Sequence, residues 1–198
     1  MARVREVIKE EVPPGSERAV FAGGCFWCLE ANFQALPGVR GAINGYSGGE
    51  EVNPSYKEIC DQQTGHREAV LVYYDPEKVG YEALLDVFWQ SIDPTDSDGQ
   101  FFDRGFSYTT AIFYLNEEQK RLAEASKQAV QTNFDRPVAT AILPYVSFYE
   151  AEEYHQEFYQ KSPRRYKDYS HASGREEYKR LVWEAILKQR ADKKKGSV

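Results

Sequence analysis

The chain has 198 residues, of which 41% are hydrophobic and 28% are charged, proportions typical of a single globular domain with a sizeable core. Its 25 Lys and Arg against 31 Asp and Glu give a net charge of −6 without a basic stripe, which argues against nucleic acid as a partner. No apolar run approaches the roughly 20 residues of a membrane span, and the N-terminus mixes Arg, Lys and Glu where a signal peptide needs an apolar stretch. We therefore expect a cytoplasmic protein that binds neither nucleic acid nor a membrane.

The polar ends of the chain set the expected domain boundaries. Residues 1–18 are expected to form an N-terminal arm, because they are polar and close with Pro13-Pro14-Gly15-Ser16. Residues 19–190 then form a single catalytic domain, and the lysine-rich end, 191–198, is expected to be a disordered tail. We expect this one-domain protein to be a monomer.

Hydrophobic periodicity and turn residues predict strands and helices that interleave along the chain. Strands are expected at 19–22, 39–46, 68–74, 108–115 and 139–149. Helices are expected at 25–36, 81–92, 117–133, 151–160 and 175–189, the last with Tyr178, Leu181, Val182 and Ala185 on one face. Loops fill 47–67 and 93–107. This order favours an α+β fold, a ferredoxin-like two-layer sandwich whose mixed sheet carries packed helices, with extra C-terminal helices.

Two cysteines lie where the first strand passes into the first helix. Gly23 and Gly24 precede Cys25, and Cys28 follows three residues later. The free N–H groups and the dipole at a helix N-terminus stabilise an anion, so this position should lower the pKa of Cys25 and favour it as a nucleophile. Residues three apart share a helix face, and a Cys-x-x-Cys pair can close into a disulfide. Cys28 is therefore the natural resolving thiol.

Two structural alternatives compete with this interpretation. Both cysteines could be core residues, although the glycines would allow a substrate to approach closely. They could also be half of a metal site, but the remaining candidate ligands do not form a second pair at a convincing spacing. Those candidates are Cys60, His66, His155 and His171. We expect no metal, a structural His66, and surface positions for His155 and His171.

Six segments, in order along roughly residues 19–160, make the chain resemble the A-type peptide methionine sulfoxide reductases. They are Gly-Cys-Phe-Trp-Cys at 24–28, Leu-Pro-Gly-Val at 36–39, Gly-Tyr-Ser-Gly-Gly at 45–49, Asn-Pro-Ser-Tyr at 53–56, Thr-Gly-His-Arg-Glu-Ala-Val at 64–70, and Asp-Arg-Gly at 103–105 with Ser-Tyr at 107–108. Each segment alone is weak, but their order is hard to produce by chance. The resemblance implies reduction of free or protein-bound methionine sulfoxide.

The same resemblance implies a role for each matching residue. Cys25 attacks the sulfoxide sulfur and becomes a sulfenic acid. Glu68, Tyr56 and Tyr108 donate protons or hydrogen bonds to the departing oxygen, and Asp103 matches a further polar residue of the site. A carboxyl group donates only while protonated, so Glu68 should be shielded from water with a raised pKa.

The resemblance also assigns the substrate wall and the recycling step. Phe26 and Trp27 look like the apolar wall for the substrate methyl group, which sets a preference for the S epimer. The chain has no cysteine after Cys60, so the sulfenic acid must be resolved by Cys28, by Cys60 or by an external thiol. Cys28 is favoured by its proximity, and Cys60 is expected to be buried. Thioredoxin or another dithiol is the implied reductant, with no bound cofactor.

Two other functions keep part of this pattern. A thioredoxin-like thiol-disulfide oxidoreductase would also have Cys-x-x-Cys at a strand-to-helix turn, but it would leave Glu68, Tyr56 and Asp103 without a task. A redox-sensing binding module without enzymatic activity could instead use the C-terminal helix as a partner surface.

Overall fold

The structure, a computed structural model, describes residues 12–195. The strands are β1 Glu17–Gly23, β2 Val39–Ser47, β3 Arg67–Tyr74, β4 Gly99–Gln100, β5 Asp103–Arg104, β6 Thr110–Tyr114, β7 Ala141–Pro144 and β8 Phe148–Glu150. The helices are α1 Phe26–Gln34, α2 Tyr56–Cys60, α3 Tyr81–Gln90, α4 Glu117–Gln131, α5 Phe158–Lys161, α6 Pro163–Ala172, α7 Arg175–Tyr178 and α8 Glu184–Lys195. Most of the expected arm, 1–11, and the end of the expected tail, 196–198, lie outside the described residues.

Six strands form one mixed sheet in the order β7-β6-β1-β3-β2-β8. Every neighbouring pair is antiparallel except β6 and β7, which are parallel. The short strands β4 and β5 form a separate hairpin. The chain therefore has the expected α+β fold with a mixed sheet and helices packed on it.

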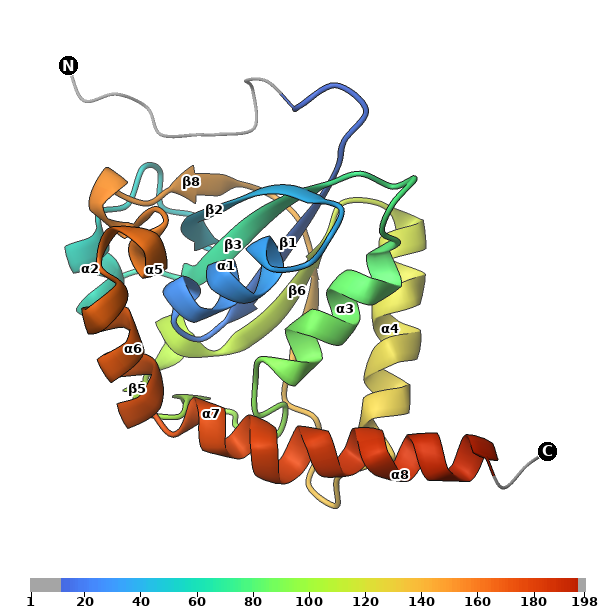
Figure 1. The fold of residues 1–198 in the computed structure, drawn as a ribbon. Coiled ribbons are helices and arrows are strands. Elements are labelled where there is room, and N and C mark those ends of the chain that lie inside the picture. The colour runs from blue at the N-terminus through green and yellow to red at the C-terminus, as the bar shows by residue number, and fades with distance from the viewer. Residues whose placement is uncertain (1–11, 196–198) are drawn as a thin grey trace.

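Successive side chains along each strand point to opposite sides of the sheet, and both sides are apolar. Ala19 and Phe21 on β1 face the helices, where the Phe21 ring stacks on Phe33 of α1 at 5.0 Å and on Phe88 of α3 at 5.3 Å between ring centroids. Val20 lies between them in sequence and belongs to a second cluster with Phe148 of β8. Figure 1 places α1 and α3 together in front of the sheet, with α4 beside α3. Burial of both faces fixes the register that carries the site residues.

The expected single strand over 139–149 was wrong, because two strands on opposite edges of the sheet occupy that stretch. β7 pairs with β6, whereas β8 pairs with β2, and residues 145–147 connect them. The curl of the sheet brings the two edges within reach of this short connection. Apolar residues continue through it, so the sequence pattern carries no sign of the switch.

The C-terminal part also differs from the expected pattern. The expected helix over 151–160 is replaced by a 3-10 turn at Glu153–His155 and the short α5, and α6 was not anticipated. The expected helix over 175–189 starts where predicted but extends through α8 to Lys195, so the tail expected from 191 begins inside a helix.

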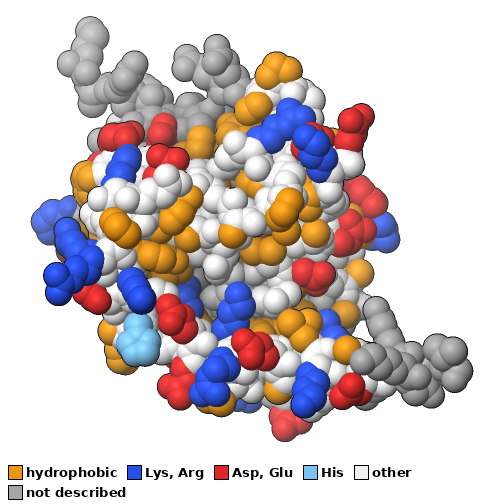
Figure 2. Space-filling view, viewed as in Figure 1, with side chains coloured by type: hydrophobic (Ala, Val, Ile, Leu, Met, Phe, Trp, Pro, Cys, Tyr) orange, Lys and Arg blue, Asp and Glu red, His pale blue; other side chains and the backbone are white. Residues whose placement is uncertain are grey.

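The last helix buries only part of the expected face: Tyr178 and Val182 are half-buried against the core, whereas Leu181 and Ala185 are exposed. A π-helical segment at Lys179–Trp183 joins α7 to α8 and shifts the phase of the helix. Trp183 and Ile186 are also buried, while Leu181 is 55% exposed. Charged side chains of both signs are interspersed along the lower edge of the molecule, where this helix runs (Figures 1 and 2). None of the helices within residues 12–195 is long and apolar enough to cross a bilayer.

Candidate active site

The turn between β1 and α1 positions Cys25 at the start of the helix. Gly24 has φ +75°, and a Cβ added there would lie 2.5 Å from the Cβ of Gln100, so the turn requires glycine. Cys25 occupies the capping position before α1. The next backbone N–H, that of Phe26, donates a 3.1 Å hydrogen bond to Oε2 of Glu68 on β3. The register of β3 thus places a carboxyl group directly at the helix N-terminus.

Cys25 and Cys28, here called the thiol pair, are both buried and share a hydrogen bond between their sulfurs. Burial raises the pKa of Cys25, so the lowered pKa expected for this residue was wrong: desolvation outweighs the stabilisation that the helix N-terminus offers. The hydrogen bond from Cys25 instead lowers the pKa of Cys28 to about 7, and Arg175 acts in the same direction. The pair therefore releases its first proton near neutral pH and holds one negative charge between two sulfurs.

Glu68 is 2% exposed and has a carboxyl group that stays protonated at neutral pH. Burial raises its pKa to about 8, although the hydrogen bond from Phe26 opposes the shift. This is the shielded environment that a proton-donating carboxyl needs. The acid therefore lies beside the thiol pair and can give a proton to an oxygen that arrives there.

The other predicted donors reach the same place from separate elements. Tyr56 begins α2 and Tyr108 ends a 3-10 turn at Phe106–Tyr108. Burial raises the pKa of both phenols and nearby Glu68 raises it further, so each keeps its proton. Asp103 on β5 accepts a hydrogen bond from the Tyr169 hydroxyl, and burial raises its pKa as well. The fold therefore brings the predicted acids and phenols together: Glu68, Asp103 and Tyr56 lie near the thiol pair, and Tyr108 lies near Glu68.

Phe26 and Trp27 form part of an aromatic wall that includes a residue we placed on the surface. His155 is 1% exposed, and its Nδ1 accepts a 3.2 Å hydrogen bond from Nε1 of Trp27. Its ring lies 5.1 Å from that of Phe26 and 4.3 Å from that of Tyr56, between centroids. Burial lowers the pKa of His155 to about 4, so the ring is neutral. The surface position expected for His155 was wrong because the 3-10 turn at 153–155 directs the side chain inward.

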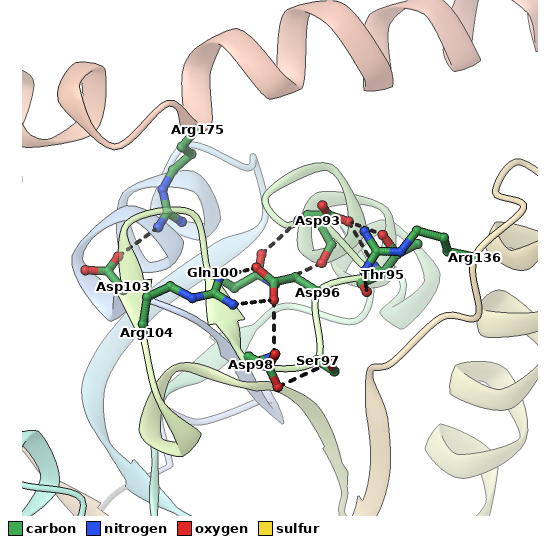
Figure 3. Close-up of polar contacts among 10 residues, drawn as sticks. All are labelled: Asp93, Thr95, Asp96, Ser97, Asp98, Gln100, Asp103, Arg104, Arg136 and Arg175. Carbon is green, nitrogen blue, oxygen red and sulfur yellow. Dashed lines mark hydrogen bonds and ion pairs between the residues drawn. The ribbon is translucent and has the colours of Figure 1, made fainter.

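Helices α6 and α7 add groups that sequence reasoning missed. Tyr166 hydrogen-bonds to Cys28, and Tyr169 meets the edge of Trp27 with 5.7 Å between ring centroids. Arg175 forms an ion pair with Asp103, with 3.6 Å between Nη2 and Oδ2. Figure 3 shows Arg175 reaching from the C-terminal helix toward Asp103. In the sequence, Gly174 was the signal of a helix end in this stretch. In the structure Gly174 has φ +80° and separates α6 from α7, but a glycine of this kind indicates a turn and does not indicate a site.

The remaining thiol, Cys60, and the histidines His66 and His171 lie on other segments than the thiol pair. Cys60 ends α2 and is exposed, so its expected burial was wrong, although its thiol hydrogen-bonds to Tyr56. His66 is buried and accepts a 3.2 Å hydrogen bond from the N–H of Gly49, which gives it the structural place expected. His171 is exposed, as expected. Within residues 12–195, no group of three His, Cys, Asp or Glu is arranged to hold a metal ion.

Fold and site together define a thiol-based redox enzyme, with a buried thiol pair beside a protonated carboxyl. The sequence matches the family described as Peptide methionine sulfoxide reductase over residues 17–187. It is 52% identical over 169 residues to peptide methionine sulfoxide reductase MsrA of Bacillus licheniformis, covering 84% of this chain and 93% of that protein. Identity to MsrA of Bacillus subtilis is 53% over 161 residues, covering 80% of this chain and 91% of that protein. The chain belongs to the peptide methionine sulfoxide reductase family and is an enzyme of its MsrA type.

Solved structures agree with this assignment. Mxr1 of Saccharomyces cerevisiae in its reduced form superposes with a TM-score of 0.74 at 30% identity, over 78% of this chain and 90% of that one. Methionine sulfoxide reductase A of Corynebacterium diphtheriae gives a TM-score of 0.70 at 29% identity, over 80% of this chain and 82% of that one. Mxr1 has also been crystallised in complex with Trx2; that structure shares 21% identity and a TM-score of 0.53, covering 76% of this chain and 91% of its own. Family membership favours sulfoxide reduction over the two alternative functions.

Proposed function

We propose that Cys25 is the nucleophile and Glu68 the acid in the reduction of methionine sulfoxide. The observation that carries this assignment is the 3.1 Å hydrogen bond between Oε2 of Glu68 and the N–H of Phe26, which sets the acid beside the capping thiol. Cys25 passes its proton along the shared hydrogen bond to the Cys28 thiolate and attacks the sulfoxide sulfur.

The oxygen then transfers with a proton from Glu68. The substrate sulfur gains two electrons and leaves as the thioether of methionine, while the Cys25 sulfur loses two and becomes a sulfenic acid. Tyr56 and Tyr108 remain protonated and hydrogen-bond to the oxygen as it develops charge, with Asp103 as a further polar group. Glu68 regains its proton from solvent.

Phe26 and Trp27 form the wall for the substrate methyl group in this proposal. Phe26 is buried against His155, and the hydrogen bond to His155 fixes the Trp27 indole. A sulfoxide of the opposite configuration would turn its oxygen toward these rings, where the oxygen would find no donor to replace water. This supports a preference for the S epimer.

Resolution of the sulfenic acid falls to Cys28 in this proposal. Its sulfur already contacts that of Cys25, so attack requires only a local distortion of the first turn of α1 to reach disulfide geometry. The S–S bond forms, the S–O bond breaks, and the Cys28 proton leaves with the hydroxyl group as water. Cys60 is the alternative resolving thiol, and its exposure keeps it open to external thiols.

A dithiol such as thioredoxin is the proposed reductant of the resulting disulfide, and no bound cofactor is needed. The complex of the yeast relative with Trx2 supports this partner. The substrates are free methionine sulfoxide and oxidised proteins, and the enzyme acts as a monomer. A catalytic cycle that depends on free thiols fits a reducing compartment, which supports the cytoplasm as its location.

Three cysteine variants test these assignments. Cys25→Ser should abolish methionine formation, because no other sulfur occupies the capping position. Cys28→Ser should release one methionine per enzyme without reductant and then stop, with loss of thioredoxin-driven turnover. Cys60→Ser is the matched control and should turn over like the parent. Methionine is counted by chromatography before and after thioredoxin, thioredoxin reductase and NADPH are added. Normal thioredoxin-driven turnover by Cys28→Ser would rule out Cys28 as the resolving thiol.

We also propose that the four central strands are ferredoxin-like. Their order, β6-β1-β3-β2, and the connections through α1 and α3 support this assignment. The outer strands β7 and β8 and the C-terminal helices are then additions to that unit. Superposition on ferredoxin-like domains of other functions tests it, and a mismatch in strand directions would contradict it.

A further inference from the structure

Arg175 is a buried cation that none of the proposed catalytic steps uses. It is the first residue of α7, and the left-handed Gly174 before it turns the chain inward from the end of α6. The side chain is only 7% exposed. Burying a guanidinium is costly unless negative charge lies nearby to compensate it. The environment of Arg175 should therefore contain its counter-charge.

The ion pair and the ring contact of Arg175 supply only part of the negative charge that a buried guanidinium needs. Its Nη2 lies 3.6 Å from Oδ2 of Asp103, which is too long for a hydrogen bond (Figure 3). Its Cζ lies 4.8 Å from the centroid of the Phe101 ring. Within the described part of the chain, Nε, Nη1 and Nη2 are all buried without a hydrogen-bond partner. The guanidinium thus has an ion-pair partner in Asp103 but three nitrogens without a hydrogen-bond partner, so a further neighbouring anion could share its charge.

The thiol pair is the neighbour that can supply this anion. Nη2 of Arg175 lies 3.8 Å from the position of a Cβ on Gly24, the residue directly before Cys25. The positive charge acts to lower the pKa of both Cys25 and Cys28. The converse also holds: burial acts to lower the pKa of Arg175, and the negative charges of Cys28 and Cys25 make the largest contributions that raise it.

The other ionisable groups around the thiol pair do not offer a second cation. They come from α2, β3, β5 and α6, and they are Tyr56, Glu68, Asp103, Tyr166 and Tyr169. Each is neutral or negative, so any charge they carry opposes thiolate formation. Among these neighbours, Arg175 is the sole group whose charge favours it.

We propose that Arg175 is the counter-ion of the thiol pair, a positioning residue that lets Cys25 and Cys28 hold one negative charge in a buried site. The inference rests on the roles proposed for the two cysteines. In this proposal the C-terminal helices have a role in catalysis. Arg175 on α7 adds a positive charge to the weak positive potential at the N-terminus of α1, which is too small to stabilise the thiolate by itself. Asp103 competes for the same guanidinium and moderates its effect on the sulfurs.

The test follows thiolate formation directly rather than turnover. The reduced enzyme is alkylated with iodoacetamide between pH 5 and 10, and mass spectrometry reports the rate at each cysteine. Arg175→Met should raise the midpoint pH of alkylation of the thiol pair by about one unit or more, because the cation is gone. Arg175→Lys should keep most of the parent midpoint. Arg180→Met, an exposed arginine on the same helical segment, is the matched control and should leave the midpoint unchanged.

Asp103→Asn provides an independent arm if Arg175→Met does not fold. Removal of this competing carboxylate should lower the midpoint, opposite in sign to Arg175→Met. Circular dichroism and thermal melting identify variants that remain folded. An unchanged midpoint in folded Arg175→Met, or in Asp103→Asn, would overturn the proposal. Alkylation does not require sulfoxide, so this result is separate from the tests of the proposed catalytic roles.

Discussion

Residues 17–114 and residues 151–183 contribute to the active site in different ways. The first region supplies the groups proposed to react, the thiol pair and Glu68, from the ends of strands and the first turn of a helix. The second supplies His155 and Tyr169, whose rings contact those of Phe26 and Trp27, and Arg175, whose charge acts to lower the pKa of Cys25, Cys28 and Glu68. The two regions thus differ in what they contribute: the first holds the groups proposed to react, and the second buries them and places the charge of Arg175 near the thiol pair.

The largest effect is expected in the first region, at Glu68. Glu68→Gln keeps the shape and loses the acidic proton, so methionine release in the first turnover should fall by about 10² to 10⁴-fold, the range for a general acid. Rapid-quench measurement of methionine gives this rate. Glu30→Gln is the matched control: Glu30 is also a buried carboxyl with a pKa raised to about 7 by burial, but it hydrogen-bonds to Asn44 and to the N–H of Glu157. It should stay within about twofold of the parent, since it donates to no substrate atom.

The pH profile of the same step sharpens the role of Glu68. The thiol pair provides a nucleophile above about pH 7, where Cys28 loses its proton, and Glu68 can donate below about pH 8, where it is protonated. The first-turnover rate of the parent should therefore rise toward pH 7 and fall above pH 8. Glu68→Gln cannot lose a proton, so the alkaline fall should disappear. If that fall persists in the variant, another group is the acid.

An intermediate effect is expected where the second region is anchored to the first. Trp183 is 2% exposed and its Nε1 donates a 2.9 Å hydrogen bond to the carbonyl oxygen of Ile92. Trp183→Ala should lower the free energy of unfolding by about 3 to 5 kcal/mol, because it leaves a large cavity and an unpaired carbonyl. Urea denaturation measures the change. Leu181→Gln, two positions away but exposed, should change it by less than about 0.5 kcal/mol. Equal effects would mean that the buried face has been assigned wrongly.

The smallest effect concerns the contact between the regions at His155. His155→Phe keeps an apolar ring but removes the acceptor for the Trp27 indole. Loss of one hydrogen bond costs about 1 to 2 kcal/mol, so we expect kcat/KM for methionine sulfoxide to fall by about tenfold, mainly through KM. Steady-state kinetics with saturating thioredoxin separate the two constants. A fall confined to kcat would instead place His155 at the reacting atoms.

The order of the long strands and helices up to residue 131 followed from the sequence because each of them carries its own local signal, whereas α2, β4 and β5 lie in stretches that were expected to be loops. A continuous run of β-branched, aliphatic and aromatic residues marks the strand at 68–74, and paired glycines mark the turn before Cys25. The split of 139–149 into two strands was not predictable, since it depends on the curl of a sheet made elsewhere in the chain. The burial of Trp183 and Ile186 was not anticipated for a similar reason, because it depends on the surface against which the last helix packs.

The sequence by itself pointed to the candidate nucleophile, acid and substrate wall: Cys25 through its place at a strand-to-helix turn, and Glu68 and Phe26 through motifs that resemble those of the family. Only the tertiary structure decided their electrostatic state. Whether a thiol in this site is charged depends on its exclusion from water and on the distance to groups such as Arg175, which is far away along the chain. Both are properties of three-dimensional packing, and no spacing in the sequence encodes them.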